Sequence, residues 1–144
     1  MLDPAFVAAR TALPNLGEAE LLESARDGAH AHQRIRLRFT AHLAPAVTAV
    51  IDLDRLTWVD DATYDLTGHT AEHRIVPDHY GDRLTSSYRA TLTAHGDGTR
   101  RVLAGTVKVR MPLVGGKVER AIVSGLAEHA AAEAALVNDW LTRA

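Results

Sequence analysis

The sequence contains no cysteine, and this absence excludes several kinds of chemistry. A chain without cysteine forms no disulfide, offers no thiolate nucleophile and builds no cysteine-based zinc site. It also suits a reducing compartment, so we expect the protein to be cytoplasmic. Long apolar runs are missing too: none approaches the ~20 residues that a membrane-spanning helix needs. Residues 1–14 lack the basic and apolar regions of a signal peptide, so the sequence predicts neither export nor membrane insertion.

The chain also carries little net charge. Its formal net charge is −2, so it has no basic field that would attract nucleic acid or an anionic membrane. We therefore expect no nucleic-acid partner and no integral membrane segment. Apolar content, in contrast, is ample: 144 residues with 47% hydrophobic side chains can bury one core. The sequence predicts a single domain over residues 1–144.

The first forty residues predict a short helix followed by a hairpin. Asp3-Pro4 is typical of a helix start, since aspartate caps the helix and proline fits its first turn, and Pro14 ends the pattern. Residues 18–26 and 30–40 then flank Asp27-Gly28, a dipeptide that supplies the positive φ angles of a tight turn. These two segments are therefore predicted to pair as antiparallel strands.

The second of these strands alternates between apolar and arginine side chains. Because successive strand residues point to opposite faces, Ile35, Leu37 and Phe39 are predicted to face the core. The opposite face carries an arginine row, Arg34, Arg36 and Arg38. We interpret this row as a solvated strand face, and a partner-binding surface is the alternative.

The middle of the chain predicts two more hairpins. Residues 43–53 are apolar and contain an early proline, which suits a short helix or a bent connection. Residues 55–66 and 69–76 follow as strands joined by a turn at a glycine. Residues 83–95 and 99–111 surround Gly-Asp-Gly and are predicted to be the longest strands.

The carboxyl-terminal part predicts one long amphipathic helix over residues 117–142. Its apolar residues recur at spacings of three or four or their multiples, namely Val118, Ile122, Leu126, Ala130, Val137 and Leu141. Charged residues occupy other positions, namely Glu119, Arg120, Glu128 and Glu133. At 1.5 Å per residue such a helix is long enough to cross a small domain.

Two features of this region invite functional interpretations. Gly115-Gly116 precedes the helix, but the spacing matches neither the Walker nor the Rossmann phosphate-binding pattern. We interpret this glycine pair as a sharp strand-to-helix turn that needs unusual φ angles. His129 and Glu133 lie four residues apart on the helix, and this spacing predicts a modest surface contact.

This order of elements predicts an α+β fold in which a curved antiparallel sheet grips the long terminal helix. Three segments carry a family resemblance: residues 3–6 (DPAF), 107–119 (VKVRMPLVGGKVE) and 133–141. With them the chain resembles the START-like superfamily, also called helix-grip or SRPBCC, which includes polyketide cyclases and lipid-transfer domains. It is most similar to an actinobacterial family of that superfamily, a domain of unknown function.

The resemblance implies a cavity between the sheet and the helix that binds an apolar small molecule or lipid, without a cofactor. Members usually begin with a strand and a fuller first helix, whereas this chain starts at what resembles the middle of that helix. We therefore expect the usual first strand to be missing, with a start placed too far downstream as the favoured explanation. An open sheet edge would favour pairing with another strand, so the oligomeric state stays open.

In such a fold the core face of the sheet is also the wall of the cavity, and this selects the ligand-binding candidates. The candidates on strands are Phe39, Trp58, Tyr64, Tyr88, Leu92, Val107, Val109 and Met111. Those on the terminal helix are Val118, Ile122 and Leu126. Tyrosine and tryptophan would supply the few polar groups that apolar pockets use to orient a ligand.

Catalytic candidates are few. Asp60 is unusual because alternation places it on the same side as Trp58 and Tyr64, and a carboxylate there suits a general acid. A local bulge that turns Asp60 outward is the simpler explanation. The alternative function is a polyketide cyclase- or dehydratase-like enzyme with Asp60, His73 or Tyr88 as acid or base. A structural or interaction domain whose own side chains fill the cavity is the third hypothesis.

A metal site is the last candidate. His69 and His73 lie four apart on a predicted strand, so they share a face and could ligate a metal with Asp78 or His79. Eight histidines make chance pairs common, and zinc usually needs three converging protein ligands. We therefore expect surface or cavity-lining imidazoles and no metal.

Overall fold

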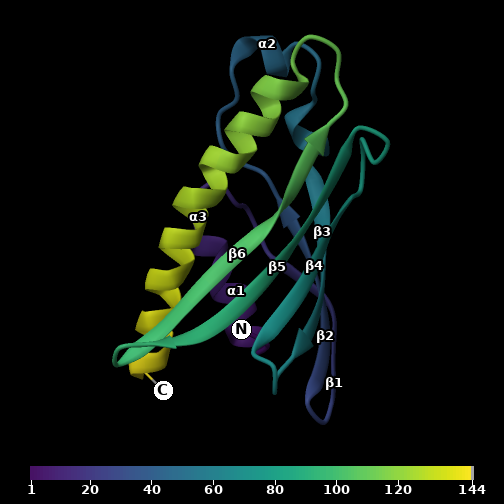
Figure 1. Cartoon of the computed structure of the whole chain (residues 1–144). Helices are drawn as coiled ribbons and strands as arrows, with labels where there is room; N and C mark the ends of the chain where they lie inside the picture. The colour runs from purple at the N-terminus through teal and green to yellow at the C-terminus, as the bar shows by residue number, and fades with distance from the viewer. Residues whose placement is uncertain (144) are drawn as a thin grey trace.

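The computed structural model describes residues 1–143, which form a six-stranded antiparallel sheet curved around a long helix (Figure 1). Neighbouring strands follow chain order: β1 (Glu20–Asp27), β2 (His30–Arg38), β3 (Thr57–Asp65), β4 (Thr70–Pro77), β5 (Leu84–His95) and β6 (Gly98–Val109). The helices are α1 (Pro4–Ala9), α2 (Pro45–Thr48) and α3 (Gly115–Arg143), with 3₁₀ turns η1 (Arg10–Ala12) and η2 (Leu53–Arg55). The predicted α+β class is confirmed, and the arrangement is consistent with a helix-grip fold.

The hairpins form where the glycine turns predicted them. Asp27 pairs with His30, so the first turn consists of two residues, and of the predicted pair it is Gly28 that adopts positive φ (57°). The β5–β6 turn uses Gly96 in the same way, also at φ 57°. These strands are the longest, as expected, with 12 residues each. In both turns the absence of a Cβ lets the chain reverse without steric cost.

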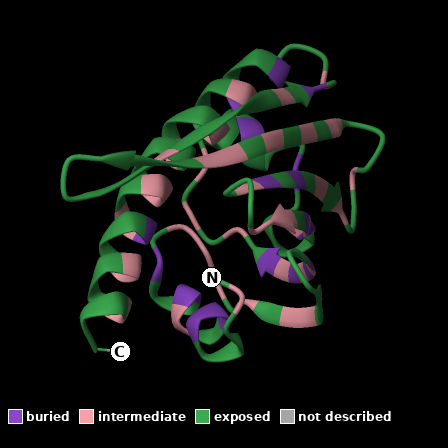
Figure 2. Ribbon diagram, turned by 60° about the horizontal axis from the view of Figure 1, so that its bottom comes forward, coloured by how far each residue is buried: buried purple, intermediate pink, exposed green. Residues whose placement is uncertain are grey.

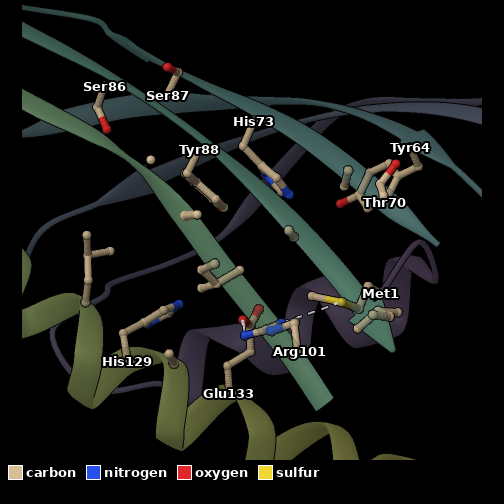
Figure 3. Close-up of a pocket in the computed structure, with 18 of the residues that line it drawn as sticks. Met1, Tyr64, Thr70, His73, Ser86, Ser87, Tyr88, Arg101, His129 and Glu133 are labelled. Atoms are coloured by element: carbon tan, nitrogen blue, oxygen red, sulfur yellow. Dashed lines mark hydrogen bonds and ion pairs between the residues drawn. The ribbon is translucent and has the colours of Figure 1, made fainter. Parts of the chain in front are cut away.

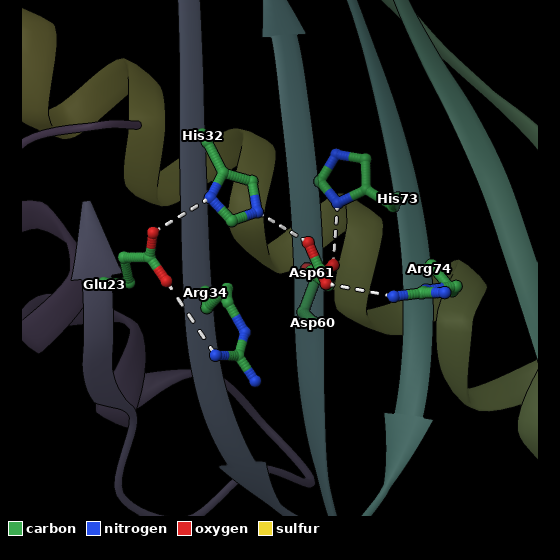
Figure 4. A network of polar contacts seen from close by, with 7 residues as sticks. All are labelled: Glu23, His32, Arg34, Asp60, Asp61, His73 and Arg74. Atoms are coloured by element: carbon green, nitrogen blue, oxygen red, sulfur yellow. Dashed lines mark hydrogen bonds and ion pairs between the residues drawn. The ribbon is translucent and has the colours of Figure 1, made fainter. Parts of the chain in front are cut away.

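The arginine row lies on the outer face of β2 and forms ion pairs across the sheet. Arg36 lies 3.0 Å from Asp78 and 3.2 Å from Glu20. Arg34 lies 3.8 Å from Glu23, as Figure 4 shows. The inward residues of β2 are buried, as alternation predicts. Neighbouring carboxylates compensate Arg34 and Arg36, and Arg38 donates to the backbone carbonyl of Asp54, so the geometry favours a solvated face over a partner surface.

The start of α3 corrects the prediction for Gly115-Gly116. Both glycines belong to the first turn of α3, and the positive φ of this connection (67°) occurs at Leu113. A Cβ on Gly115 would lie 2.7 Å from the carbonyl oxygen of Val109, so close backbone approach explains that glycine. Glu119 secures the junction, because its Oε1 accepts a hydrogen bond from the Val109 N–H at 2.8 Å.

The buried core is split between two places. One cluster, at the start of α3, consists of Val47, Ile51, Val109 and Val118. The other, beneath α1, consists of Val7, Ile35 and Leu37. Figure 2 shows that much of α3 is exposed, with few fully buried residues along its length. The sheet and α3 are therefore only partly sealed against each other, and space remains between them.

Near its carboxyl end, α3 is held by α1. The ring of Phe6, 1% exposed, meets the ring of Trp140 edge-on at 5.6 Å between centroids. Asp3 caps α1 by accepting a hydrogen bond from the Ala5 N–H at 2.8 Å, as the Asp-Pro start predicts. In the described part of the chain, no helix is both long and apolar enough to cross a membrane.

Candidate functional site

Within the described residues, two neighbouring cavities lie between the sheet and α3. The larger has a volume of about 910 Å³ and the smaller about 250 Å³. They share a wall made of Arg10, Ser86, Tyr88, Val107, Leu126 and His129. Figure 3 shows the larger cavity, where His73 and Tyr88 of the sheet face His129 and Glu133 of α3. The two cavities can therefore be treated as two compartments of one site.

The structure places every predicted ligand-binding residue on these walls. The smaller cavity is lined by Phe39, Trp58, Val109, Met111, Val118 and Ile122. The larger is lined by Tyr64 and Leu92, and both by Tyr88, Val107 and Leu126. Leu92 and Leu126 are 40% and 46% exposed, so the larger cavity opens to solvent. Contact with a ligand remains a prediction for all of these residues.

The prediction that a bulge turns Asp60 outward is wrong. Asp60 pairs in continuous register with Ile35 on one side and Ile75 on the other, and it is 4% exposed. Its Oδ1 lies 2.9 Å from Nδ1 of His73, and its Oδ2 accepts a hydrogen bond from the Tyr88 hydroxyl at 3.4 Å. Two polar partners thus make inward placement of this carboxylate tolerable.

The His73 ring is held from several sides. It stacks on the Tyr88 ring with 4.3 Å between centroids and an interplanar angle of 8°. If Nδ1 carries the proton and donates to Asp60, Nε2 is left as an acceptor. His73 lines the larger cavity, and its Nε2 makes no hydrogen bond to any described residue. Chemically, an oriented imidazole with a free acceptor nitrogen can act as a general base.

His69 does not belong to a strand as predicted, although it lines the larger cavity together with His73. His69 lies in the turn before β4 with φ 53°, so strand alternation does not extend to it. Asp78, another suggested ligand, is engaged by Arg36 on the outer face. Among residues 1–143, no group of three or more His, Asp or Glu side chains could hold a metal ion.

The predicted surface contact between His129 and Glu133 is also wrong. Glu133 is 5% exposed and lies inside the site, where its Oε2 accepts a hydrogen bond from Arg101 at 2.5 Å. Its Oε1 lies 3.4 Å from Nε of Arg10. Burial opposes ionisation of Glu133, but Arg10 and Arg101 outweigh it and lower the pKa of the carboxyl. The result is a buried cluster of two cations and one anion.

Three other titratable groups of the walls, namely His129, Tyr64 and Tyr88, are held in their neutral forms. Burial lowers the pKa of His129, which disfavours its imidazolium form. Burial, followed by the charge of Asp60, raises the pKa of Tyr64 to about 12 and raises that of Tyr88 as well. At neutral pH the walls therefore present an uncharged imidazole and two uncharged phenols as hydrogen-bonding groups.

The chain matches one family model over residues 1–141, described as a protein of unknown function, DUF2505. The chain belongs to the DUF2505 family. Its fold is similar to that of TTHA0849 from Thermus thermophilus, known from a crystal structure. The TM-score is 0.61 at 19% sequence identity, and the match covers 94% of this chain and 78% of that one, which shows likeness of fold. No curated protein matches the sequence.

Three charged residues of this DUF2505 chain were missed by the sequence interpretation. Arg10, the first residue of η1, follows buried Phe6 by four residues. Arg101 lies an even number of residues from Val109 on β6, so both point to the inner face of the sheet. Glu133 follows Leu126 by seven residues, which is two helical turns, and thus lies on the inward stripe of α3. The spacing signal was present in all three cases, but Glu133 was predicted to lie at the surface and neither arginine was considered.

Proposed function

We propose that this DUF2505 chain is a START-like binding module that holds an apolar small molecule or lipid between the sheet and α3. One observation carries the proposal: apolar side chains of the larger cavity stand open to solvent. Leu103 is 40% exposed, Val123 58% and Leu126 46%. Covering such a surface is favourable by about 25 cal/mol per Å², so an apolar ligand would gain free energy there.

The size and lining of the site support the same proposal. Small-molecule pockets typically occupy about 300–1,000 Å³ and combine apolar walls with a few placed polar groups. The larger cavity, at about 910 Å³, lies within that range. The smaller one adds a mostly apolar compartment lined by Leu37, Leu56 and Trp58. A ligand with an extended or branched apolar body would use both compartments.

Filling the larger cavity should weaken binding of an uncharged apolar probe. The fluorescent probe N-phenyl-1-naphthylamine is expected to bind the unmodified protein, and Ala127→Phe to weaken that binding about tenfold or more, because the new ring occupies the cavity. Ala131→Phe is the matched control, since both alanines are exposed residues of the same helix but Ala131 lines neither cavity. Fluorescence titration gives both affinities. Absence of probe binding, or equal loss in both variants, would contradict the proposal.

The Asp60–His73 pair supports a second candidate, an acid–base enzyme related in type to polyketide cyclases or dehydratases. Its reactive atom would be Nε2 of His73, which lines the larger cavity next to two neutral phenols. The chain also holds a His–Asp pair outside: Nε2 of His32 lies 2.8 Å from Asp61 on the outer face, in the network of Figure 4. Nδ1 of His32 lies 3.4 Å from Glu23, so both of its ring nitrogens face carboxylates, and this pair serves as a control without a free ring nitrogen.

Proton abstraction from 5-nitrobenzisoxazole tests this second candidate. In that reaction a base removes the ring C–H proton while the N–O bond breaks and a coloured phenolate leaves. If His73 is a general base, the protein should accelerate the reaction, and His73→Gln should slow it about tenfold or more. His32→Gln should leave the rate unchanged. A rate no higher than that of buffer would count against the enzyme.

A further inference from the structure

Arg10 is a buried cation with unused hydrogen-bond donors. The residue is 9% exposed, and its Nε has no hydrogen-bond partner although Oε1 of Glu133 lies 3.4 Å away. The terminal nitrogens of Arg10 make no hydrogen bond to any residue that the structure describes. A guanidinium has five N–H donors, and burying donors without acceptors is unfavourable even where Glu133 compensates the charge. An acceptor group supplied by a bound ligand would satisfy these donors.

The nearby carboxylates do not supply that partner. Glu133 is shared, because Arg101 already donates to it at 2.5 Å, so two guanidinium groups compete for one carboxylate. Asp60 lines the smaller cavity, but its oxygens are engaged by His73 and Tyr88. The remaining acidic residues on the walls of the larger cavity, Asp3 and Asp65, accept hydrogen bonds from backbone N–H groups. The Arg10 guanidinium therefore has more N–H donors than the surrounding residues have free acceptors.

The position of Arg10 defines where a ligand's charged group would sit. Arg10 lines both cavities, on the wall that they share with Tyr88 and His129. A ligand bound there by its head can place its apolar body against Trp58 in one compartment or Leu92 in the other. A planar guanidinium matches a carboxylate with two parallel hydrogen bonds, which a single ammonium group does not. The neutral His129 imidazole can donate one more.

We infer that the ligand is a carboxylic acid with an apolar body, and that its carboxylate binds Arg10 where the two cavities meet. This inference rests on the proposed binding function and specifies the chemical class of its ligand. An arginine with free donors at the junction of two apolar compartments selects an amphiphilic anion over a wholly apolar molecule. It also explains why this buried position at the start of η1 carries a charge.

A pair of probes that differ in one group tests the inference. Dansylaminoundecanoic acid and its methyl ester share the same fluorescent apolar body, and only the acid carries a carboxylate. The unmodified protein is expected to bind the acid about tenfold more tightly than the ester or better, because charge-assisted hydrogen bonds form with Arg10. Fluorescence titration of both probes at equal salt concentration measures the ratio.

Two variants assign the preference to Arg10. Arg10→Met should remove the preference for the acid and leave ester binding close to that of the unmodified protein. Arg10→Lys keeps a cation beside Glu133, so it protects against loss of folding, and should retain only a small part of the preference. Arg34→Met, on the outer face, should change neither affinity. Ester binding reports in each case that the variant is folded.

The outcomes separate the inference from the function on which it rests. Equal binding of acid and ester by the unmodified protein overturns the inference and leaves the binding function standing. A preference for the acid that survives in both Arg10 variants overturns the assignment to Arg10. Failure of both probes to bind, together with failure of the uncharged probe, overturns the binding function itself.

Discussion

Glu133→Gln is expected to lower the free energy of unfolding by about 3–5 kcal/mol. Glu133 is the shared anion of a buried cluster, with Arg101 at 2.5 Å and Arg10 at 3.4 Å. Glutamine keeps the shape but removes the charge, so buried Arg10 and half-buried Arg101 lose their counter-charge. The loss is large because the side chain of Glu133 is only 6% exposed and water cannot replace it. Urea unfolding followed by circular dichroism measures the difference.

Glu128→Gln is the control for this prediction. Glu128 lies on the exposed side of α3, so its substitution should change stability by less than about 0.5 kcal/mol. The contribution of Glu133 to the free energy of unfolding should also depend on pH. Because its folded-state pKa is lowered, its stabilisation is present above the ordinary glutamate value of about 4.3 and is lost as pH falls through the folded pKa. Equal losses of stability in the two variants would contradict the role of Glu133 in the buried cluster. So would a stability difference between Glu133→Gln and the unmodified protein that persists at acid pH.

Gly105→Ala is expected to destabilise the protein by about 3 kcal/mol, at the upper end of overpacking effects. Gly105 faces Tyr88 across the β5–β6 pair. A Cβ at this position would lie 2.2 Å from the carbonyl oxygen of Ser87 and 2.4 Å from Cβ of Tyr88. Those neighbours are backbone or backbone-anchored atoms, so the strands themselves would have to separate. Equilibrium unfolding in urea measures the loss.

Gly125→Ala is the control, because the same substitution is expected here to stabilise the protein. Gly125 lies inside α3, and an added Cβ meets no described atom within 4 Å. Alanine is the better helix former, so this substitution should stabilise the protein by about 0.5–1 kcal/mol. The two glycine substitutions are thus expected to differ in sign. If Gly105→Ala proved as harmless as Gly125→Ala, the close approach of β5 and β6 at Tyr88 would be wrong.

Much of the fold could be predicted from local patterns. Alternation on β2 identified its buried face, and glycine at position 28 or 96 identified a hairpin turn, because both depend on residues near in sequence. The long terminal helix was predicted within two residues of its observed ends. The prediction for Gly115 failed because that position needs glycine for another reason. The backbone of Val109, which belongs to a separate element, lies too close to leave room for a Cβ.

The candidate site was predicted only in part, for the same reason. Its apolar wall residues follow from the inward faces of strands and helix, and Tyr88 or Leu126 needed no knowledge of their partners. Asp60 was expected to turn away because a lone carboxylate on an apolar face is unfavourable. His73 on the adjacent strand makes it acceptable, and that partner is known only once the register of β3 and β4 is known.

The sequence by itself determined the α+β class, the hairpins, the long helix and the apolar faces that meet in the middle. These depend on side-chain periodicity and turn chemistry, which act over a few residues. Tertiary structure decided where charge is buried: Arg10, Arg101 and Glu133 come from three distant segments and meet inside the site. A buried charge is stable only beside its partners, so its position cannot be inferred until the fold brings those partners together.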